Sequence, residues 1–354
     1  MKSRLNILFS GIILFTLSCG DGKEEGSKPS SPRIKKNTKV ELPKNNEKFT
    51  RGDLIPFEFS STGAAIDSII LVVEESVEKF SKAKFEMRLP GRKVGTWSIR
   101  AKVYCEGESE THFRKVIVLP EAAPREMTYT VSNSYPHQTS DYTQGLLIHE
   151  GFLYESTGQK GESSLKKKEL KTGKTLKVTN LADQYFGEGL ALINEEFYQL
   201  TWTSGQGFVY SLDLEQKRTF SYPMEGWGLT TYNDLLILTD ETEKLYFIEP
   251  SSFTVQYQLE VYDDEGKVEA LNELEFIDGK VWANIFQKDD IVVIDPETGE
   301  VLQRIDFSGL LTQEEAKNAD VLNGIAVDPE TGKIYITGKD WPKLFEITIQ
   351  EKPL

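Results

Sequence analysis

A repeat in the C-terminal part of this 354-residue chain constrains the fold more than any other feature. From residue 127 to the end, a short start segment recurs about every 44 residues, and β-prone runs follow it. The five starts are Gln144-Gly145-Leu146, Glu188-Gly189-Leu190, Trp227-Gly228-Leu229, Asn272-Glu273-Leu274 and Asn323-Gly324-Ile325. A period of this length with three or four strands per repeat is typical of a β-propeller blade. The sequence therefore predicts an all-β fold with a five-bladed β-propeller over residues 127–354.

The first residue of each start has an equivalent place in the predicted blade. Because the first strand of a propeller blade lines the central channel, these five side chains are expected to surround one space. Only one of them, Glu188, is ionisable. One carboxylate among amides and an indole suits a site for one small polar ligand. The alternative interpretation is that these residues are polar only because water fills the channel.

The first 34 residues predict export and membrane attachment. Lys2 and Arg4 precede an apolar run, from Ile7 to Leu17, that is too short to span a bilayer. Ser18-Cys19-Gly20 then resembles the cleavage point of a bacterial lipoprotein signal, although Leu17 lies one place later than the usual lipobox leucine. We expect residues 1–19 to be a lipoprotein signal peptide with lipidated Cys19, and residues 20–34 to be a flexible tether. An ordinary signal peptide with a chance cysteine is the alternative.

The location that follows from this interpretation is a bacterial membrane, with the chain exported and held by its lipid. The acidic run from Asp21 to Glu25 favours the outer membrane, on its periplasmic or cell-surface side, although a solvated tether explains the same run.

Residues 35–120 have the pattern of a separate small β domain. Apolar and polar residues alternate from Trp97 to Cys105, which places one set on a buried face. Several such short runs separated by turn sequences predict an immunoglobulin-like β-sandwich. Cys105 falls on the apolar face and is expected to be an inert core thiol. We interpret this domain as a spacer or interaction module, followed by a linker over residues 121–126.

Composition excludes several classes of protein. The formal net charge of −15 argues against a general nucleic-acid binder. Two cysteines and three histidines are too few for a disulfide scaffold and argue against a Cys/His zinc cluster. We expect no metal, no cofactor and no nucleic-acid partner, and a monomeric protein.

Eight short motifs after residue 140 resemble a single family. They are Asp141-Tyr142-Thr143-Gln144-Gly145-Leu146, Tyr154-Glu155-Ser156-Thr157-Gly158, Phe186-Gly187-Glu188-Gly189, Gln199-Leu200-Thr201-Trp202, Gly226-Trp227-Gly228-Leu229-Thr230, Leu271-Asn272-Glu273-Leu274-Glu275, Leu322-Asn323-Gly324-Ile325-Ala326 and Thr337-Gly338-Lys339-Asp340-Trp341-Pro342. Each motif alone is weak, but their order and spacing resemble the plant and bacterial (papaya-type) glutaminyl-peptide cyclotransferases over about residues 127–350. The resemblance implies a five-bladed propeller that acts on peptides or proteins with an N-terminal glutamine. The reaction converts that glutamine to pyroglutamate and releases ammonia.

The resemblance also implies roles for individual residues. The glutamate that carries protons in this family matches Glu188, which would be the general acid and base of a metal-independent aminoacyltransferase. Positions that bind the substrate or wall the pocket fall on Tyr142, Gln144, Trp202, Trp227, Asn272, Phe286 and Lys339, and Asn323 takes the fifth channel position. Two of these depart from the family pattern, since Tyr142 stands where Phe is frequent and Phe286 where a third pocket tryptophan is expected. Two roles remain open for Asn323: it either contacts the ligand or bonds to the backbone as a turn residue.

Two other functions remain open from the sequence. A non-catalytic cell-surface propeller could bind peptides or glycans with the same residues, and the change at Phe286 is compatible with it. A propeller hydrolase or lactonase usually needs several carboxylates around a channel metal, whereas the five channel positions offer only Glu188. The retained Glu188 favours the cyclotransferase.

Overall fold

The computed structural model describes residues 36–352, and their regular secondary structure is almost entirely β-strand. The predicted signal peptide with Cys19 and the predicted tether lie outside the described residues. The all-β prediction is confirmed, since the helical content of the described residues is the short 3-10 turn η1 (Glu315–Lys317). Within residues 36–352, no helix is long and apolar enough to cross a membrane.

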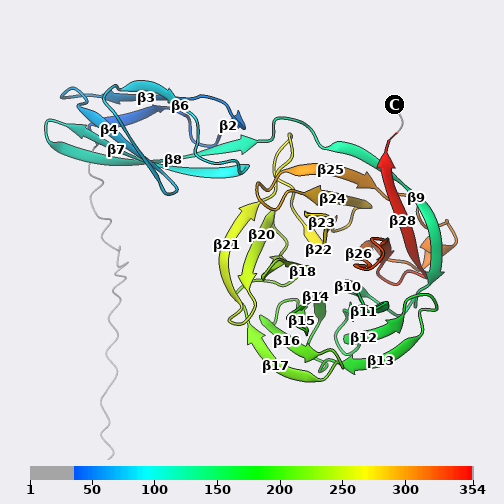
Figure 1. The fold of residues 1–354 in the computed structure, drawn as a ribbon. Helices are drawn as coiled ribbons and strands as arrows, with labels where there is room; N and C mark the ends of the chain where they lie inside the picture. The colour runs from blue at the N-terminus through cyan, green and yellow to red at the C-terminus, as the bar shows by residue number, and fades with distance from the viewer. Residues whose placement is uncertain (1–35, 353–354) are drawn as a thin grey trace, which may run out of the picture. The chain divides into compact units, whose positions relative to one another are not determined.

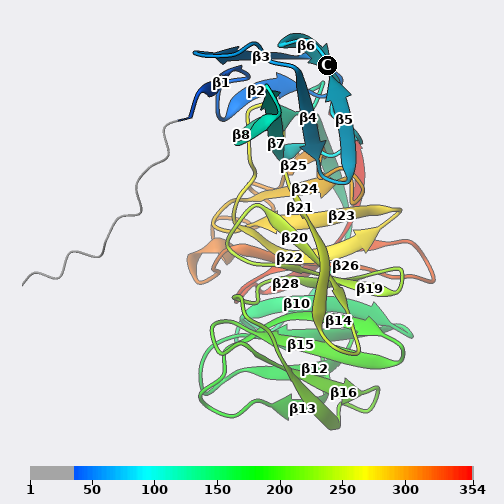
Figure 2. The same cartoon turned by 90° about the vertical axis from the view of Figure 1, so that its left-hand side faces the viewer.

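The N-terminal part is built from two facing sheets. Its strands are β1 (Thr38–Leu42), β2 (Glu47–Thr50), β3 (Ile55–Ser61), β4 (Ser68–Val73), β5 (Ser76–Phe80), β6 (Lys84–Met87), β7 (Gly95–Cys105) and β8 (Glu108–Leu119). One sheet has the order β1-β3-β6 and the other the order β2-β8-β7-β4-β5. Figure 2 shows the three-stranded sheet over the five-stranded one, and a single apolar cluster that includes Phe57, Ile69 and Trp97 fills the space between them.

Strand β7 shows how the sequence pattern forms this core. Trp97, Ile99, Ala101 and Val103 are buried while the residues between them face outward, as the alternation predicts. Cys105 differs from the prediction of a buried thiol. It is a free, partly buried cysteine that packs against the cluster, because it is the last residue of β7, beside the turn to β8.

The C-terminal part is a ring of sheets. Its strands are β9 (Arg125–Pro136), β10 (Thr143–His149), β11 (Phe152–Thr157), β12 (Ser164–Glu169), β13 (Thr175–Asn180), β14 (Gly187–Ile193), β15 (Glu196–Thr201), β16 (Gln206–Ser211), β17 (Gln216–Ser221), β18 (Leu229–Tyr232), β19 (Leu235–Thr239), β20 (Lys244–Glu249), β21 (Thr254–Glu260), β22 (Leu271–Ile277), β23 (Lys280–Ile285), β24 (Asp290–Ile294), β25 (Val301–Asp306), β26 (Leu322–Val327), β27 (Ile334–Gly338) and β28 (Lys343–Glu351). Figure 1 shows β10, β14, β18, β22 and β26 nearest the centre. Each of these inner strands contacts the next, and β26 contacts β10, so the ring is closed and propeller-like.

Hydrogen bonding between the two ends of the ring closes it. Strands β10–β13, β14–β17 and β18–β21 form three four-stranded sheets. The remaining strands form one eight-stranded sheet of order β22-β23-β24-β25-β9-β28-β27-β26. In it, β9 pairs with β28 in antiparallel fashion from Met127 to Pro136, and it touches β25 in a short parallel pairing. The first and last strands of the ring therefore lie side by side, and opening the ring would break this ladder.

Close packing at the centre explains the glycines of the repeat starts. A Cβ atom on Gly145 would lie 2.5 Å from Leu190 N, and one on Gly228 would lie 1.9 Å from Asn272 O. No side chain fits at such distances from a neighbouring backbone. The inner strands approach one another this closely only because glycine occupies these positions.

Candidate functional site

Four of the inner strands have a β-bulge at the position of the predicted site residues. The register shifts between Thr143 and Gly145, Gly187 and Leu190, Leu271 and Leu274, and Leu322 and Ile325. A β-bulge redirects the residues that it contains, and bulges are frequent beside active sites. The bypassed segments begin with Gln144, Glu188, Asn272 and Asn323, which are four of the five predicted channel residues.

A cavity of about 230 Å³ lies beside these bulges. It is lined by Tyr142, Gln144, Phe186, Glu188, Trp202, Trp227, Asn272, Phe286 and Lys339. The structure therefore brings together all the predicted catalytic and substrate-binding residues except Asn323, from segments spread over 198 positions of the chain between 142 and 339. A small pocket with aromatic walls and a few polar groups suits one small polar ligand.

Aromatic rings form the walls of this pocket. Phe186 makes edge contacts with Tyr142 and Trp202, with ring centroids 6.0 Å and 5.8 Å apart. On another side, Trp227 and Phe286 meet edge to face at 5.4 Å. Trp202 is 40% exposed, so its indole lies at the mouth of the pocket.

A carboxylate that the sequence reasoning missed holds both indoles. Glu225 Oε2 accepts hydrogen bonds from Trp202 Nε1 at 2.8 Å and from Trp227 Nε1 at 3.2 Å. Phe186 was also missed, although it lies two residues before Glu188 in a quoted motif. The signal for Glu225 was its place immediately before Gly226-Trp227, but a carboxylate in a loop is more often a solvated surface group.

Glu188 is a buried carboxyl that lines the pocket, with 4% of its surface exposed. Gln144 Nε2 donates a hydrogen bond to Glu188 Oε1 at 2.9 Å. Burial raises the pKa of Glu188 well above its usual value, and the charge of Glu225 adds to this rise. The positive charge of Lys339 and the hydrogen bond from Gln144 oppose it. A raised pKa brings a carboxyl closer to the range in which it can both take up and release a proton.

Lys339 supplies the positive charge of the site. Its Nζ lies 4.9 Å from the centroid of the Tyr142 ring and 5.0 Å from that of Phe286. Burial lowers the pKa of Lys339, whereas the negative charge of Glu188 raises it. The faces of the two aromatic rings also favour the charged ammonium.

The two asparagines of the repeat starts occupy different places. Asn272 lines the pocket, and its buried Oδ1 has no partner among the described residues, so it is available to accept a hydrogen bond from a ligand. Asn323 is fully buried and is not among the pocket-lining residues. Its Nδ2 donates instead to Thr143 O at 2.9 Å and to Gln144 Oε1 at 3.0 Å.

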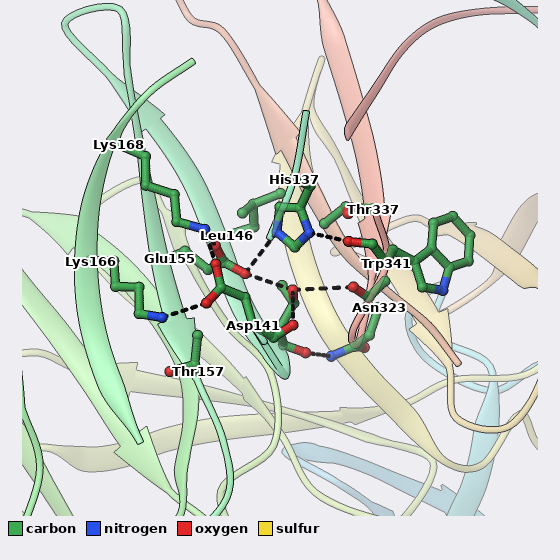
Figure 3. A network of polar contacts seen from close by, with 12 residues as sticks. His137, Asp141, Leu146, Glu155, Thr157, Lys166, Lys168, Asn323, Thr337 and Trp341 are labelled. Carbon is green, nitrogen blue, oxygen red and sulfur yellow. Dashed lines mark hydrogen bonds and ion pairs between the residues drawn. The ribbon is translucent and has the colours of Figure 1, made fainter. Parts of the chain in front are cut away.

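Figure 3 shows a buried cluster of charged side chains around Asp141 and Glu155. Lys168 Nζ contacts both Asp141 and Glu155, and Lys166 contacts Asp141. Together with His137, these two carboxylates have the composition of a metal site, with ligand atoms within 4.8 Å of one another. The Lys168 ammonium, however, already bridges the two carboxylates, so the cluster is a salt-bridge network and fits a metal ion poorly.

Comparisons with known proteins show which family the chain belongs to. A family model described as "Glutamine cyclotransferase" matches residues 101–349. The chain is 40% identical over 223 residues to a glutaminyl-peptide cyclotransferase of Arabidopsis thaliana, an alignment that covers 61% of this chain and 70% of the relative. The crystal structure of Myxococcus xanthus glutaminyl cyclase superimposes with a TM-score of 0.61 at 38% identity, covering 65% of this chain and 100% of that one. The chain therefore belongs to the glutamine cyclotransferase family.

Proposed function

We propose that this protein is a glutaminyl-peptide cyclotransferase, an aminoacyltransferase that works without a metal ion. Its substrates would be peptides or proteins with an N-terminal glutamine. Glu188 is the proposed proton carrier. The observation that supports this most directly is that one buried carboxyl with a raised pKa, Glu188, is the single carboxyl of the described residues lining an aromatic pocket sized for one side chain.

The chemistry needs one group that moves a proton between two nitrogens. The α-amine of the substrate has a pKa near 8 and attacks the carbon of its own γ-carboxamide. The amine nitrogen loses one proton, the C–N bond to the amide nitrogen breaks, and that nitrogen gains one proton and leaves as ammonia. A carboxylate within reach of both nitrogens can carry this proton, which is worth about 10²–10⁴ in rate.

The other residues of the pocket have proposed roles in binding. Nucleophile and electrophile belong to one flexible side chain, so the pocket has to fold that chain back and hold it. The rings of Tyr142, Trp202, Trp227 and Phe286 would wall it in, and Asn272 Oδ1 would accept a hydrogen bond from it. Lys339 would place its charge near the oxygen that becomes negative during the attack.

Three finer points of architecture and location are also proposals. We interpret the eight-stranded sheet as two blades joined through β9, which gives five blades in all. We interpret the N-terminal sandwich as immunoglobulin-like. We further propose that the chain is exported and anchored by lipid at Cys19, on the strength of the N-terminal sequence, and that it is a monomer.

Ammonia release from a glutamine-initiated dipeptide tests the proposed function directly. The full chain should release ammonia and form pyroglutamate equally with and without EDTA. Glu188→Gln should lower kcat by about 10²–10⁴ with the fold intact. Glu275→Gln is a control, because Glu275 is a partly buried carboxyl of the inner strands with a pKa raised by desolvation to about 8, yet it does not line the pocket of Glu188.

Each result of this assay has a definite meaning. Peptide binding without ammonia release would support a non-catalytic binder. Activity abolished by EDTA would contradict the metal-free mechanism, and activity retained in Glu188→Gln would contradict the role of Glu188.

A further inference from the structure

The orientation of the Gln144 amide follows from its neighbours. Thr143 O is a backbone carbonyl and can only accept a hydrogen bond, so the Asn323 atom 2.9 Å from it is Nδ2. The same Nδ2 lies 3.0 Å from the Gln144 side chain, which therefore presents Oε1. The remaining Gln144 atom is Nε2, and it faces Glu188 Oε1 at 2.9 Å. A backbone carbonyl thus fixes the direction of every hydrogen bond up to Glu188.

We propose that Asn323 is a positioning residue, which holds the Gln144 amide in the orientation that presents N–H rather than C=O to Glu188. This inference rests on the proposed function only in taking Glu188 as the proton carrier. It assigns Asn323 a role that acts through Gln144, in place of a direct contact with the substrate.

The orientation matters because the two ends of an amide affect a carboxyl in opposite ways. An N–H donor stabilises the ionised carboxylate, whereas a carbonyl oxygen at the same place repels it and favours the protonated acid. The ionised form of Glu188 is the one that can take a proton from the substrate amine. Asn323 therefore favours the form of Glu188 that begins the reaction.

Buried contacts hold Thr143 in place, whose carbonyl oxygen orients the Asn323 amide. Thr143 Oγ1 donates to Glu155 Oε1 at 2.6 Å, and its backbone N donates to Asp141 O at 2.9 Å. The positive charge of Lys168 compensates the charge of Glu155, which favours its ionised form as the acceptor of this hydrogen bond. Because Thr143 begins the β10 bulge, these contacts fix the carbonyl from which Asn323 takes its orientation.

Other charged or titratable side chains also face Glu188 and have to stay constant in any test. Lys339 and Glu225 act on it from outside β10 and β26, and the phenols of Tyr142 and Tyr222 interact with its charge. The variants below leave all four in place.

The test measures the titration of Glu188 in the substrate-free full chain. Carbon-13 NMR of glutamate side-chain carboxyls reports it, and the signal lost in Glu188→Gln assigns it. In Asn323→Leu, the amide of Gln144 is free to turn, so the pKa of Glu188 should rise by about one unit, the effect of losing a hydrogen bond to a charged group. Gln144→Leu should give a similar rise, and the double variant should add nothing further.

Asn284→Leu is the matched control. Asn284 is equally buried, and its Oδ1 accepts a hydrogen bond from Gly324 N at 3.1 Å, beside Asn323. This variant disturbs the same bulge without removing the contact to Gln144, so the titration of Glu188 should stay as in the wild type. Equal shifts in Asn284→Leu and Asn323→Leu, additive shifts in the double variant, or no shift at all would overturn the proposal.

Kinetics separate this proposal from the proposed function. If the wild-type chain turns over a glutamine-initiated dipeptide, Asn323→Leu should lower kcat about tenfold and change KM little. The reason is that Asn323 acts through Gln144 on Glu188 and not on the walls of the pocket. A rise in KM with unchanged kcat would indicate a substrate contact and refute the positioning role. An inactive wild type would refute the proposed function, while the NMR titration would still decide the role of Asn323.

Discussion

Replacing Lys168 with methionine removes a positive charge that contacts both Asp141 and Glu155 in the interior of the ring. All three side chains are completely buried, so water cannot solvate the carboxylates that remain. Breaking a buried ion pair by removing one partner costs about 3–5 kcal/mol, because an uncompensated charge is left behind. We expect Lys168→Met to lower the free energy of unfolding of the ring by this amount at pH 7.

The pH dependence of this loss follows from Glu155. Burial alone would raise the pKa of Glu155, but the charges of Lys168 and His137 outweigh burial and hold it below its usual value of 4.5. In the wild type, ionised Glu155 therefore stabilises the fold above pH 4.5, and this contribution is lost as the pH falls through the lowered pKa. Without Lys168, burial is opposed less, the folded pKa rises, and protonation relieves the variant. The destabilisation should be largest near neutral pH and shrink below about pH 5.

Urea unfolding followed by tryptophan fluorescence measures both effects, since four of the five tryptophans lie in the ring. Lys166→Met is the control, because Lys166 contacts the same Asp141 from the same strand but keeps 15% of its side chain exposed. Its loss should cost about 1 kcal/mol or less, since Lys168 still compensates the carboxylates. Equal losses in the two variants, or a loss in Lys168→Met that grows as the pH falls, would refute the reasoning.

Two further substitutions test the pocket wall and the packing of the inner strands. Phe286→Leu removes the ring that faces Trp227 and Lys339, so kcat/KM for a glutamine-initiated dipeptide should fall about tenfold, while Phe276→Leu, outside the pocket, should change it less than about twofold. Gly228→Ala places a Cβ 1.9 Å from Asn272 O and should cost about 3 kcal/mol or more in urea unfolding. In Gly63→Ala, where no heavy atom lies within 4 Å, the change should stay within about 0.5 kcal/mol, and a similar cost at both positions would contradict the packing argument.

Features that repeat along the chain were predictable from the sequence. The recurrence of the starts located the inner strands and, through their equivalence, Gln144, Glu188, Trp227 and Asn272 around one pocket. Alternation located the buried face of β7. The repeat did not predict that Asn323, unlike the other four residues, stays out of the pocket lining. The period fixes a residue's position along its strand, but not how far its side chain extends from the bulge.

Contacts between distant segments left no local pattern. Lys166, Lys167 and Lys168 are three consecutive lysines on β12, and a strand of this composition is normally a solvated face. Of the three, only Lys168 is fully buried, and it pairs there with Asp141 and Glu155. These partners lie 27 and 13 residues away in the sequence, so nothing next to Lys168 in the chain indicates them. No rule of period or propensity distinguishes it from its two neighbours.

The bulges that orient the pocket side chains also explain why a carboxylate is buried at the centre of the ring. A bulge interrupts the ladder, and backbone N–H groups near it then need other acceptors. Glu273 meets this need at the centre, where its Oε1 accepts from Leu146 N at 3.1 Å and its Oε2 from Ile325 N at 2.8 Å. Leu146 directly follows Gly145, where the neighbouring inner strand comes so close, and Ile325 directly follows Gly324, whose φ is positive. Two polar side chains are therefore needed here: one that accepts hydrogen bonds from the backbone of neighbouring inner strands, and one that faces the pocket. Asn272 and Glu273, adjacent in one bulge, divide these two tasks between them.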